Sequence, residues 1–118
     1  MGESGSSLAS KHCVPCRGGV PPLKGADLEK FSSQLPAWRV VDEHHVEKSF
    51  AFDNFVKALD FVNRVGGIAE AEGHHPDVCL GWGYAKVTTF THKIQGLTES
   101  DFILAAKIDE EFFRESGS

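Results

Sequence analysis

Hydrophobic residues recur at helical spacing in three parts of the chain. The first part, residues 27–35, is stopped by Pro36, and the second ends near residue 72 because Gly73 favours a helix end. The third follows Thr98, where the residues up to Asp101 resemble a capping box with Asp in place of the usual Glu. These spacings predict three amphipathic helices, with apolar faces formed by Leu28, Phe31 and Leu35, by Phe55, Val56, Leu59, Val62 and Val65, and by Phe102, Ala105, Ala106, Ile108, Phe112 and Phe113.

Runs of β-prone residues fill the intervals between the predicted helices. Lys48 interrupts the apolar face of the second run, which is typical of an edge strand. Gly83 and Tyr84 predict a tight hairpin turn between the last two runs. The order helix, two strands, helix, two strands, helix predicts an α+β fold, in which a four-stranded antiparallel sheet carries three helices on one face. The four runs are residues 38–41, 45–50, 78–82 and 85–91.

The 118 residues are about the length of one ordinary domain. Small polar residues, Gly and Pro dominate residues 1–23, so we expect a flexible N-terminal arm there, with residues 1–10 disordered. Residues 24–115 carry the predicted elements and form the single domain, and residues 116–118 form a disordered tail. The apolar fraction of 41% is enough for one modest core, so self-association would help a domain of this size.

Charge and hydropathy argue against two classes of partner. The net charge is −5 and no basic stripe is present, so a nucleic-acid surface is not indicated. No apolar stretch approaches the roughly 18–20 residues that a membrane span needs, and no secretory or import signal is recognised, so we expect a cytoplasmic protein. Residues 1–6 formally fit a myristoylation pattern, but the pattern is short and permissive, and we interpret them as a flexible start.

Two of the three cysteines, Cys13 and Cys16, form a Cys-x-x-Cys pair beside His12. The odd number of cysteines and the missing export signal argue against a disulfide framework and for a reducing compartment. A structural zinc site needs four ligands, and the sequence has no second pair of this kind. A small zinc protein that uses this arm together with His74 or His75 is nevertheless an alternative.

Three further histidines are candidates for proton transfer. His74 and His75 lie in a loop that the following proline keeps extended, and His92 lies at the end of a predicted strand. Imidazole is suited to giving and taking protons near neutral pH, and a neighbouring carboxylate can fix its tautomer. From the residues alone, proton transfer, zinc binding and an ordinary polar loop all stay open. The candidate carboxylates are Glu70, Asp77 and Asp101.

Several of these residues occur at a characteristic spacing. An acidic residue is followed by three positions and His-His-Pro, then by an aromatic residue after five positions, a His after nine more, and a downstream Asp. The arrangement resembles that of the pterin-4a-carbinolamine dehydratase family, and the resemblance covers about residues 24–114, including the order of helices and strands. The residues that carry it are Glu70, His74, His75, Pro76, Trp82, His92 and Asp101.

The resemblance implies a dehydratase (a hydro-lyase) that converts 4a-hydroxytetrahydropterin to quinonoid dihydropterin and water, a step of tetrahydrobiopterin recycling. His74, His75 and His92 would be the catalytic acids and bases, with no metal and no other cofactor. Substrate-binding positions would be Glu70, Pro76, Thr91 and Asp101.

The resemblance leaves some roles open. Glu70 and Asp101 would orient histidines or bind the edge of the pterin ring, although Glu70 could also be a solvated helix residue and Asp101 only a helix cap. The family includes homodimers and homotetramers, so a homo-oligomer is implied. Animal members also bind the dimerisation helix of a transcription factor, so a protein-binding scaffold of the coactivator type is an alternative function.

Overall fold

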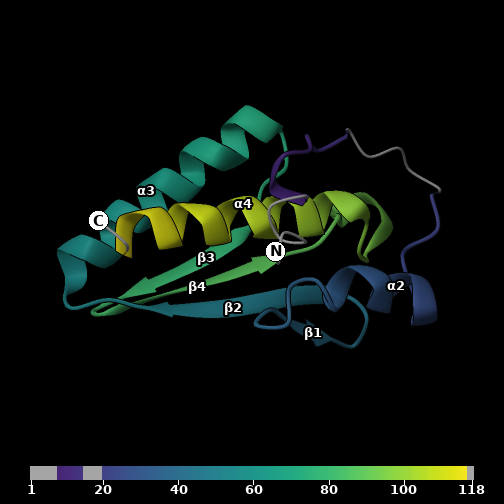
Figure 1. Ribbon diagram of the computed structural model, residues 1–118, viewed down its shortest axis with the longest axis horizontal. Coiled ribbons are helices and arrows are strands. Elements are labelled where there is room, and N and C mark those ends of the chain that lie inside the picture. The colour runs from purple at the N-terminus through teal and green to yellow at the C-terminus, as the bar shows by residue number, and fades with distance from the viewer. Residues whose placement is uncertain (1–7, 15–19, 117–118) are drawn as a thin grey trace.

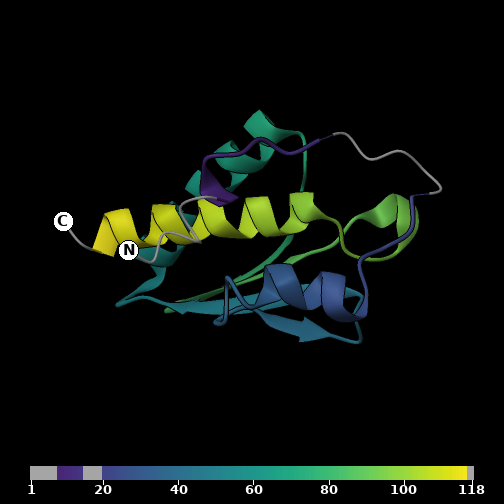
Figure 2. The same ribbon diagram turned by 45° about the vertical axis from the view of Figure 1, so that its right-hand side comes forward.

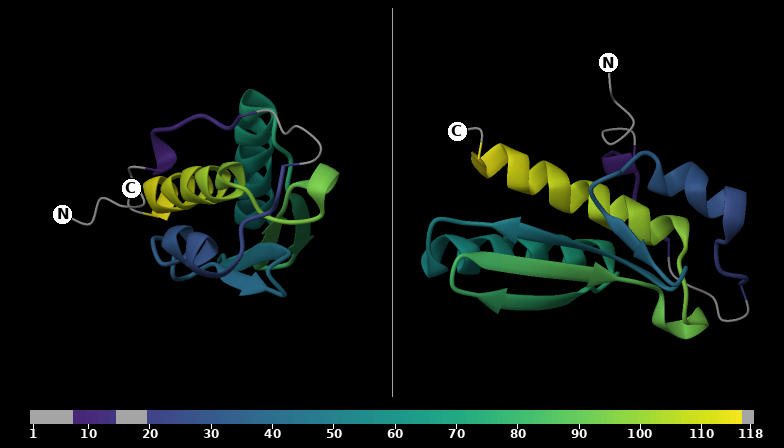
Figure 3. Two further views of the ribbon diagram at one scale, coloured as in Figure 1. Left: turned by 90° about the vertical axis from the view of Figure 1, so that its right-hand side faces the viewer. Right: turned by 90° about the horizontal axis from the view of Figure 1, so that it is seen from below.

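A four-stranded antiparallel sheet forms one layer of the molecule, and the three predicted helices form the other (Figure 1). The computed structural model describes residues 8–14 and 20–116. The helices lie on the same side of the sheet (Figures 2 and 3), which confirms the α+β architecture and the element order predicted from the sequence. None of the helices in these residues is both long and apolar enough to cross a membrane. The helices are α2 (Gly25–Ser32), α3 (Phe55–Glu72) and α4 (Glu99–Ser116).

The strands are β1 (Arg39–Val41), β2 (His45–Ala51), β3 (Asp77–Gly81) and β4 (Tyr84–Thr89), and they lie in the order β1-β2-β4-β3. Strand β2 pairs with a neighbour on both sides, so the prediction that residues 45–50 form an edge strand is wrong. Lys48 is accommodated in this interior strand because its ammonium group donates to Asp109 Oδ1 at 2.7 Å. The same group lies 4.8 Å from the centre of the Phe50 ring.

The hairpin between β3 and β4 turns one residue earlier than predicted. Gly81 pairs with Tyr84, so Trp82 and Gly83 form the two-residue loop. Gly83 has a φ of 81°, a left-handed conformation that glycine adopts at little cost and that tight hairpin turns require. The position of this glycine therefore sets the register of the hairpin.

Helix α2 also ends earlier than predicted, at Ser32 rather than at residue 35. Residues preceding a proline disfavour helical backbone, which explains why the helix does not reach Pro36. The chain continues in tight turns, in which Leu35 N–H donates to the Ser32 carbonyl at 3.0 Å. Leu35 is still buried, so the apolar pattern was correct about its environment although not about its backbone.

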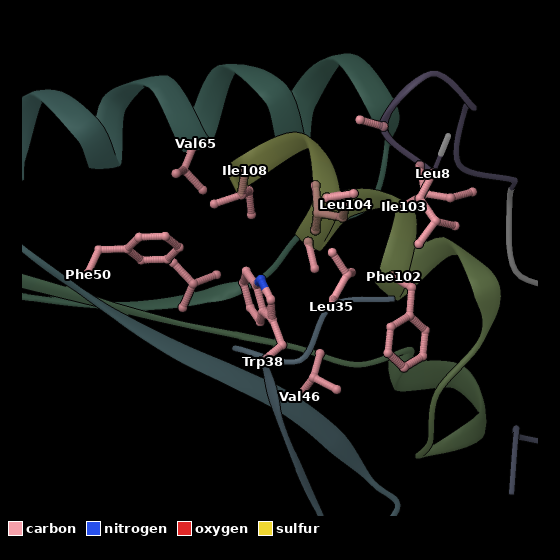
Figure 4. Packing of buried hydrophobic residues seen from close by; sticks show 14 of the residues in the cluster. Leu8, Leu35, Trp38, Val46, Phe50, Val65, Phe102, Ile103, Leu104 and Ile108 are labelled. Atoms are coloured by element: carbon pink, nitrogen blue, oxygen red, sulfur yellow. The ribbon is translucent and has the colours of Figure 1, made fainter. Parts of the chain in front are cut away.

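Apolar side chains from both layers meet in one core (Figure 4). Trp38 and Phe50 reach it from the sheet side, Val65 from α3, and Leu104 from α4, and each of these side chains is buried. The Trp38 indole N–H also donates to Asp109 Oδ2 at 3.1 Å, which satisfies its polar atom at the edge of the core. This packing fixes α3 and α4 over the sheet. It thereby places the C-terminal end of α3 and the N-terminal end of α4 near the end of β4.

Leu8 and Ala9 also belong to the core, with exposed fractions of 2% and 6%. They adopt helical conformation, and Leu8 lies beside Ile103 of α4 in Figure 4. The prediction of disorder is therefore wrong for these two residues, because their apolar side chains complete the covering of α4. The structure also places Ser10 in a turn, and Ser116 is the last residue of α4, so it is not part of a disordered tail. The other residues predicted to be disordered, 1–7 and 117–118, fall outside the described residues.

Both ends of α3 carry residues suited to them. The Asn54 side chain accepts the Lys57 backbone N–H at 2.9 Å, so Asn54 is the N-cap. At the other end, Gly73 has a φ of 67° and donates its backbone N–H to Ala69 O. Because Gly73 directly precedes His74, this helix end sets the direction in which the candidate histidines leave α3.

We expect Gly73→Ala to lower the free energy of unfolding by about 1–2 kcal/mol, because alanine is strained in the left-handed region. Gly67→Ala is the matched control. Gly67 lies in the interior of α3, and an added Cβ there would meet no atom within 4 Å. We expect this variant to gain about 0.5–1 kcal/mol through helix propensity. Urea unfolding measures both, and a gain in both variants would contradict the role assigned to Gly73.

Candidate active site

The three candidate histidines line one hollow of about 290 Å³. His74 and His75 lie in the loop between α3 and β3, and His92 begins η1 (His92–Ile94), a short 3₁₀ helix that follows β4. Strands β3 and β4 are antiparallel, with Asp77 opposite Thr88, so the start of β3 lies beside the end of β4. The topology therefore brings together imidazoles that are distant in the sequence. The residues lining the hollow are Gly73, His74, His75, Phe90, Thr91, His92 and Lys93.

Asp101 lies behind the hollow, where it is completely buried and accepts four hydrogen bonds. Its Oδ1 atom accepts from His74 Nε2 at 2.6 Å and from the Thr89 hydroxyl at 2.7 Å. Its Oδ2 atom accepts from the Thr91 hydroxyl at 2.8 Å and from the Thr98 backbone N–H at 3.0 Å. Asp101 is thus both the cap of α4 and the partner of His74, two interpretations that the sequence presented as alternatives.

His75 has a carboxylate partner of a different kind. Its Nε2 atom lies 2.7 Å from Oε2 of Glu70, a residue in the last turn of α3. Both side chains are largely exposed, so the pair adds little to stability. Its chemical effect is to orient the ring, because a hydrogen donated from Nε2 leaves Nδ1 as the free ring nitrogen.

His92 is held by ring contacts. Its centroid lies 4.2 Å from that of Phe90, which in turn lies 4.4 Å from the centroid of His44. His44 is fixed by its neighbours, with its Nδ1 atom 3.0 Å from His45 Nδ1 and its Nε2 atom 3.3 Å from Gln95 Oε1. Within residues 8–14 and 20–116, no carboxylate pairs with His92, so both of its ring nitrogens can serve a bound molecule.

The predicted binding residues fall into two groups. Thr91 lines the hollow, although its hydroxyl is bound to Asp101. Glu70 and Asp101 contact histidines without lining the hollow themselves, and Pro76 is not among the lining residues either. Three participants were not predicted from the sequence. Thr89 was marked only weakly, by lying on the same face as Thr91 within the predicted run 85–91. The missed residues are Thr89, Phe90 and Lys93.

The two tryptophans lie away from the hollow. Trp82 is 71% exposed at the tip of the β3–β4 hairpin, at the opposite end of β3 from Asp77. Trp38 is buried in the core, where its indole is bound to Asp109. Neither indole lines the hollow that the histidines form in this chain.

The alternative zinc site falls partly outside the described residues, because Cys16 lies there. The Cys13 thiol donates to the Ser100 carbonyl at 3.4 Å, and the His12 side chain is 86% exposed. Among residues 8–14 and 20–116, no three His, Cys, Asp or Glu side chains are grouped so that they could hold a metal ion.

Comparison with known proteins identifies the family. The model of the family described as pterin 4 alpha carbinolamine dehydratase matches residues 21–111. The chain belongs to this family. Among similar proteins, one from Rubrobacter xylanophilus whose name assigns it to the same family is 67% identical over 104 residues, which are 88% of this chain and 97% of the relative. A protein of the same name from Alkaliphilus metalliredigens is 50% identical over 107 residues, or 90% and 96% of the two chains.

A solved structure of the dehydratase family has the same fold. It is a protein from Brucella melitensis described as a transcriptional coactivator/pterin dehydratase, and it matches with a TM-score of 0.71 at 28% identity. The match covers 76% of this chain and 97% of the Brucella chain. The family match begins at residue 21, so the segment of residues 8–14 that packs against α4 lies outside the region that defines the pterin dehydratase family.

Proposed function

We propose that the protein dehydrates 4a-hydroxytetrahydropterin to quinonoid dihydropterin, with His74, His75 and His92 as the acids and bases. The observation that supports this most directly is the meeting of three imidazoles from two distant segments around one hollow. Two of them are oriented by carboxylates, at 2.6 Å and 2.7 Å. Family membership supplies the substrate class.

The reaction needs one proton donor and one proton acceptor. The C4a–O bond breaks as the hydroxyl takes a proton and leaves as water, and the N5–H proton is removed as the C4a=N5 double bond forms. His74 and His75 each donate Nε2–H to a carboxylate, so each presents Nδ1 to the substrate, while His92 presents either nitrogen. One imidazole, protonated on both nitrogens, gives a proton to the leaving hydroxyl and becomes neutral, while a neutral one takes the N5 proton and becomes the imidazolium, so the number of protons on the enzyme does not change.

Asp101 serves this chemistry by holding His74 rigid. Its four hydrogen bonds come from β4, from the segment after β4, from the loop after α3 and from the start of α4. Because the other three hydrogen bonds fix the Asp101 carboxylate, the His74 ring keeps its hydrogen bond to this carboxylate only in one orientation. Such preorganisation of a proton-transfer group is a general source of catalytic rate.

We expect the purified protein to accelerate the dehydration of chemically generated 4a-hydroxytetrahydropterin above its spontaneous rate, which absorbance of the quinonoid product measures. Addition of a metal chelator should leave the rate unchanged, because the proposed acids and bases are side chains. Heat-denatured protein is the control for non-specific buffer catalysis. A rate equal to the spontaneous one would refute the proposed function, and a rate lost with the chelator would refute its metal-free mechanism.

Self-association and a cytoplasmic location stay predictions. Phe55, Val56 and Leu59 expose apolar surface at the start of α3. The hairpin tip with the exposed Trp82 is close by, since the Phe52 backbone N–H donates to the carbonyl of Gly83 in that turn at 2.8 Å. Exposed apolar surface of this kind is typical of contacts between protein chains.

A further inference from the structure

A short piece of the N-terminal segment, residues 12–14, joins the ends of two helices next to the site. The Cys13 backbone N–H donates to Glu72 Oε1 at 2.8 Å, at the end of α3. The Val14 backbone N–H donates to Ser100 Oγ at 2.9 Å, at the start of α4. In Figures 1 and 2 this segment runs over α4 toward the end of α3.

Both partners of this segment lie beside the His74–Asp101 hydrogen bond. Glu72 precedes His74 by two residues, and Ser100 directly precedes Asp101. Glu72 and Ser100 are themselves buried, at 8% for the Glu72 side chain and 6% for Ser100. Residues 12–14 therefore bind the end of α3, which leads to His74, and the start of α4, which carries Asp101.

The environment of the segment keeps its groups in the ionisation states that these contacts need. Burial would raise the pKa of Glu72, but the Cys13 N–H, the His12 imidazole and the Lys107 ammonium group together hold this pKa below its ordinary value. Glu72 thus stays a carboxylate, the stronger acceptor. Burial and the charge of Glu72 raise the pKa of the Cys13 thiol to about 12, so the thiol stays neutral and can donate to Ser100 O.

We propose that residues 12–14 position the His74–Asp101 pair by joining the end of α3 to the start of α4, and that Glu72 is the positioning residue of this contact. His74 and Asp101 are 27 residues apart and belong to different elements, so their 2.6 Å hydrogen bond depends on the distance between the two helix ends. A displacement of about 1 Å in a catalytic group can cost about 100-fold in rate. The proposal rests on the proposed function for its kinetic readout only.

Core covering alone does not account for these contacts. Leu8 and Ala9 are the apolar residues of the segment that cover α4. Cys13 packs against the core as well, but residues 12–14 also make polar contacts that are directed at the two positions flanking the site. A purely structural role would make Glu72 equivalent to any other buried carboxylate that joins α3 to α4.

Glu111 is such a carboxylate and gives a matched control. It is buried on α4, with 8% exposed, and accepts from Arg64 of α3 at 3.2 Å and from Arg114 at 3.0 Å. It therefore joins the same two helices through a charged hydrogen bond. Arg64 lies about two helical turns before Glu72, away from the hollow.

The experiment compares Glu72→Ala, Ser100→Ala and Glu111→Ala, each at a temperature where circular dichroism shows full folding. We expect Glu72→Ala and Ser100→Ala to lower kcat about tenfold with KM within about twofold, since the substrate contacts remain. Glu111→Ala should keep the kcat of the wild type. Glu72→Gln should restore most of kcat, because its amide oxygen can still accept the Cys13 N–H.

A second readout does not depend on activity. The His74 backbone N–H donates to Ala69 O at 3.2 Å, and its hydrogen exchange, followed by NMR, reports the order of the helix end. We expect exchange about tenfold faster in Glu72→Ala and Ser100→Ala, and unchanged exchange in Glu111→Ala.

The outcomes separate the two proposals. An inactive wild-type protein refutes the dehydratase function, and the exchange result alone then decides the positioning role. Wild-type kcat and wild-type His74 exchange in folded Glu72→Ala and Ser100→Ala would overturn the positioning role while leaving the dehydratase function intact. Equal loss in Glu111→Ala would show a general effect of helix pairing and would overturn it as well.

Discussion

Replacing His75 or His92 by alanine is expected to lower kcat/KM for 4a-hydroxytetrahydropterin by about 10²–10⁴, because each change removes a proton-transfer group. Both side chains are on the exposed side of the site, so neither change leaves a cavity in the core. The assay follows the quinonoid product against the spontaneous dehydration. His75 and His92 are cleaner tests than His74, since removal of His74 also leaves a buried carboxylate without one of its donors.

Lys57→Gln is the control for these variants. Lys57 is exposed on α3, lies outside the hollow, and its ammonium group pairs with Asp53 at 3.3 Å. We expect it to keep the wild-type rate. If folded His75→Ala and His92→Ala both keep the full rate, the assignment of the site to this hollow is wrong.

Asp101→Ala is expected to lower the free energy of unfolding by about 3–5 kcal/mol, the usual cost of breaking a buried, charge-assisted network. The change removes the acceptor of four donors, three of them side chains, at a position with no exposure. It also removes the helix cap at Thr98, which alone contributes about 1 kcal/mol. Urea unfolding followed by fluorescence measures the change.

The control for this prediction is Asp60→Ala. Asp60 forms an exposed pair with Arg64 one helical turn along α3, at 3.1 Å. Pairs of this kind contribute about 0.3–0.5 kcal/mol, so its loss should be barely measurable. A similarly small loss for Asp101→Ala would mean that the buried network does not stabilise the fold.

The helices and strands could be predicted because their apolar positions follow the period of each element. The hydrophobic pattern gave wrong predictions where contacts between residues distant in the sequence determine the environment of a side chain. Lys48 looked like an edge-strand residue, but its partner Asp109 lies 61 residues away and makes an interior position tolerable. In the same way, nothing in the sequence near Leu8 shows that α4 has an apolar surface around Ile103 against which this side chain packs.

The site was predictable to a similar degree. His74, His75 and His92 stood out through their residue type and spacing, and Asp101 through its position at a helix start. Thr89 was marked only by lying two positions before Thr91, a weak signal, since a threonine in a strand is ordinary and its bond to Asp101 exists only once β4 and α4 meet. Local pattern therefore finds the reactive groups, whereas the groups that hold them depend on the tertiary structure.

Leu8 and Ala9 have a practical consequence for anyone who shortens the gene. The region matched by the family model begins at residue 21, which invites a truncation there. Such a protein would lack two side chains that the native interior includes, and would present bare hydrocarbon around Ile103 to water. Poor solubility or lost activity in a shortened protein would then reflect the cut, and would say nothing about the enzyme that the whole chain forms.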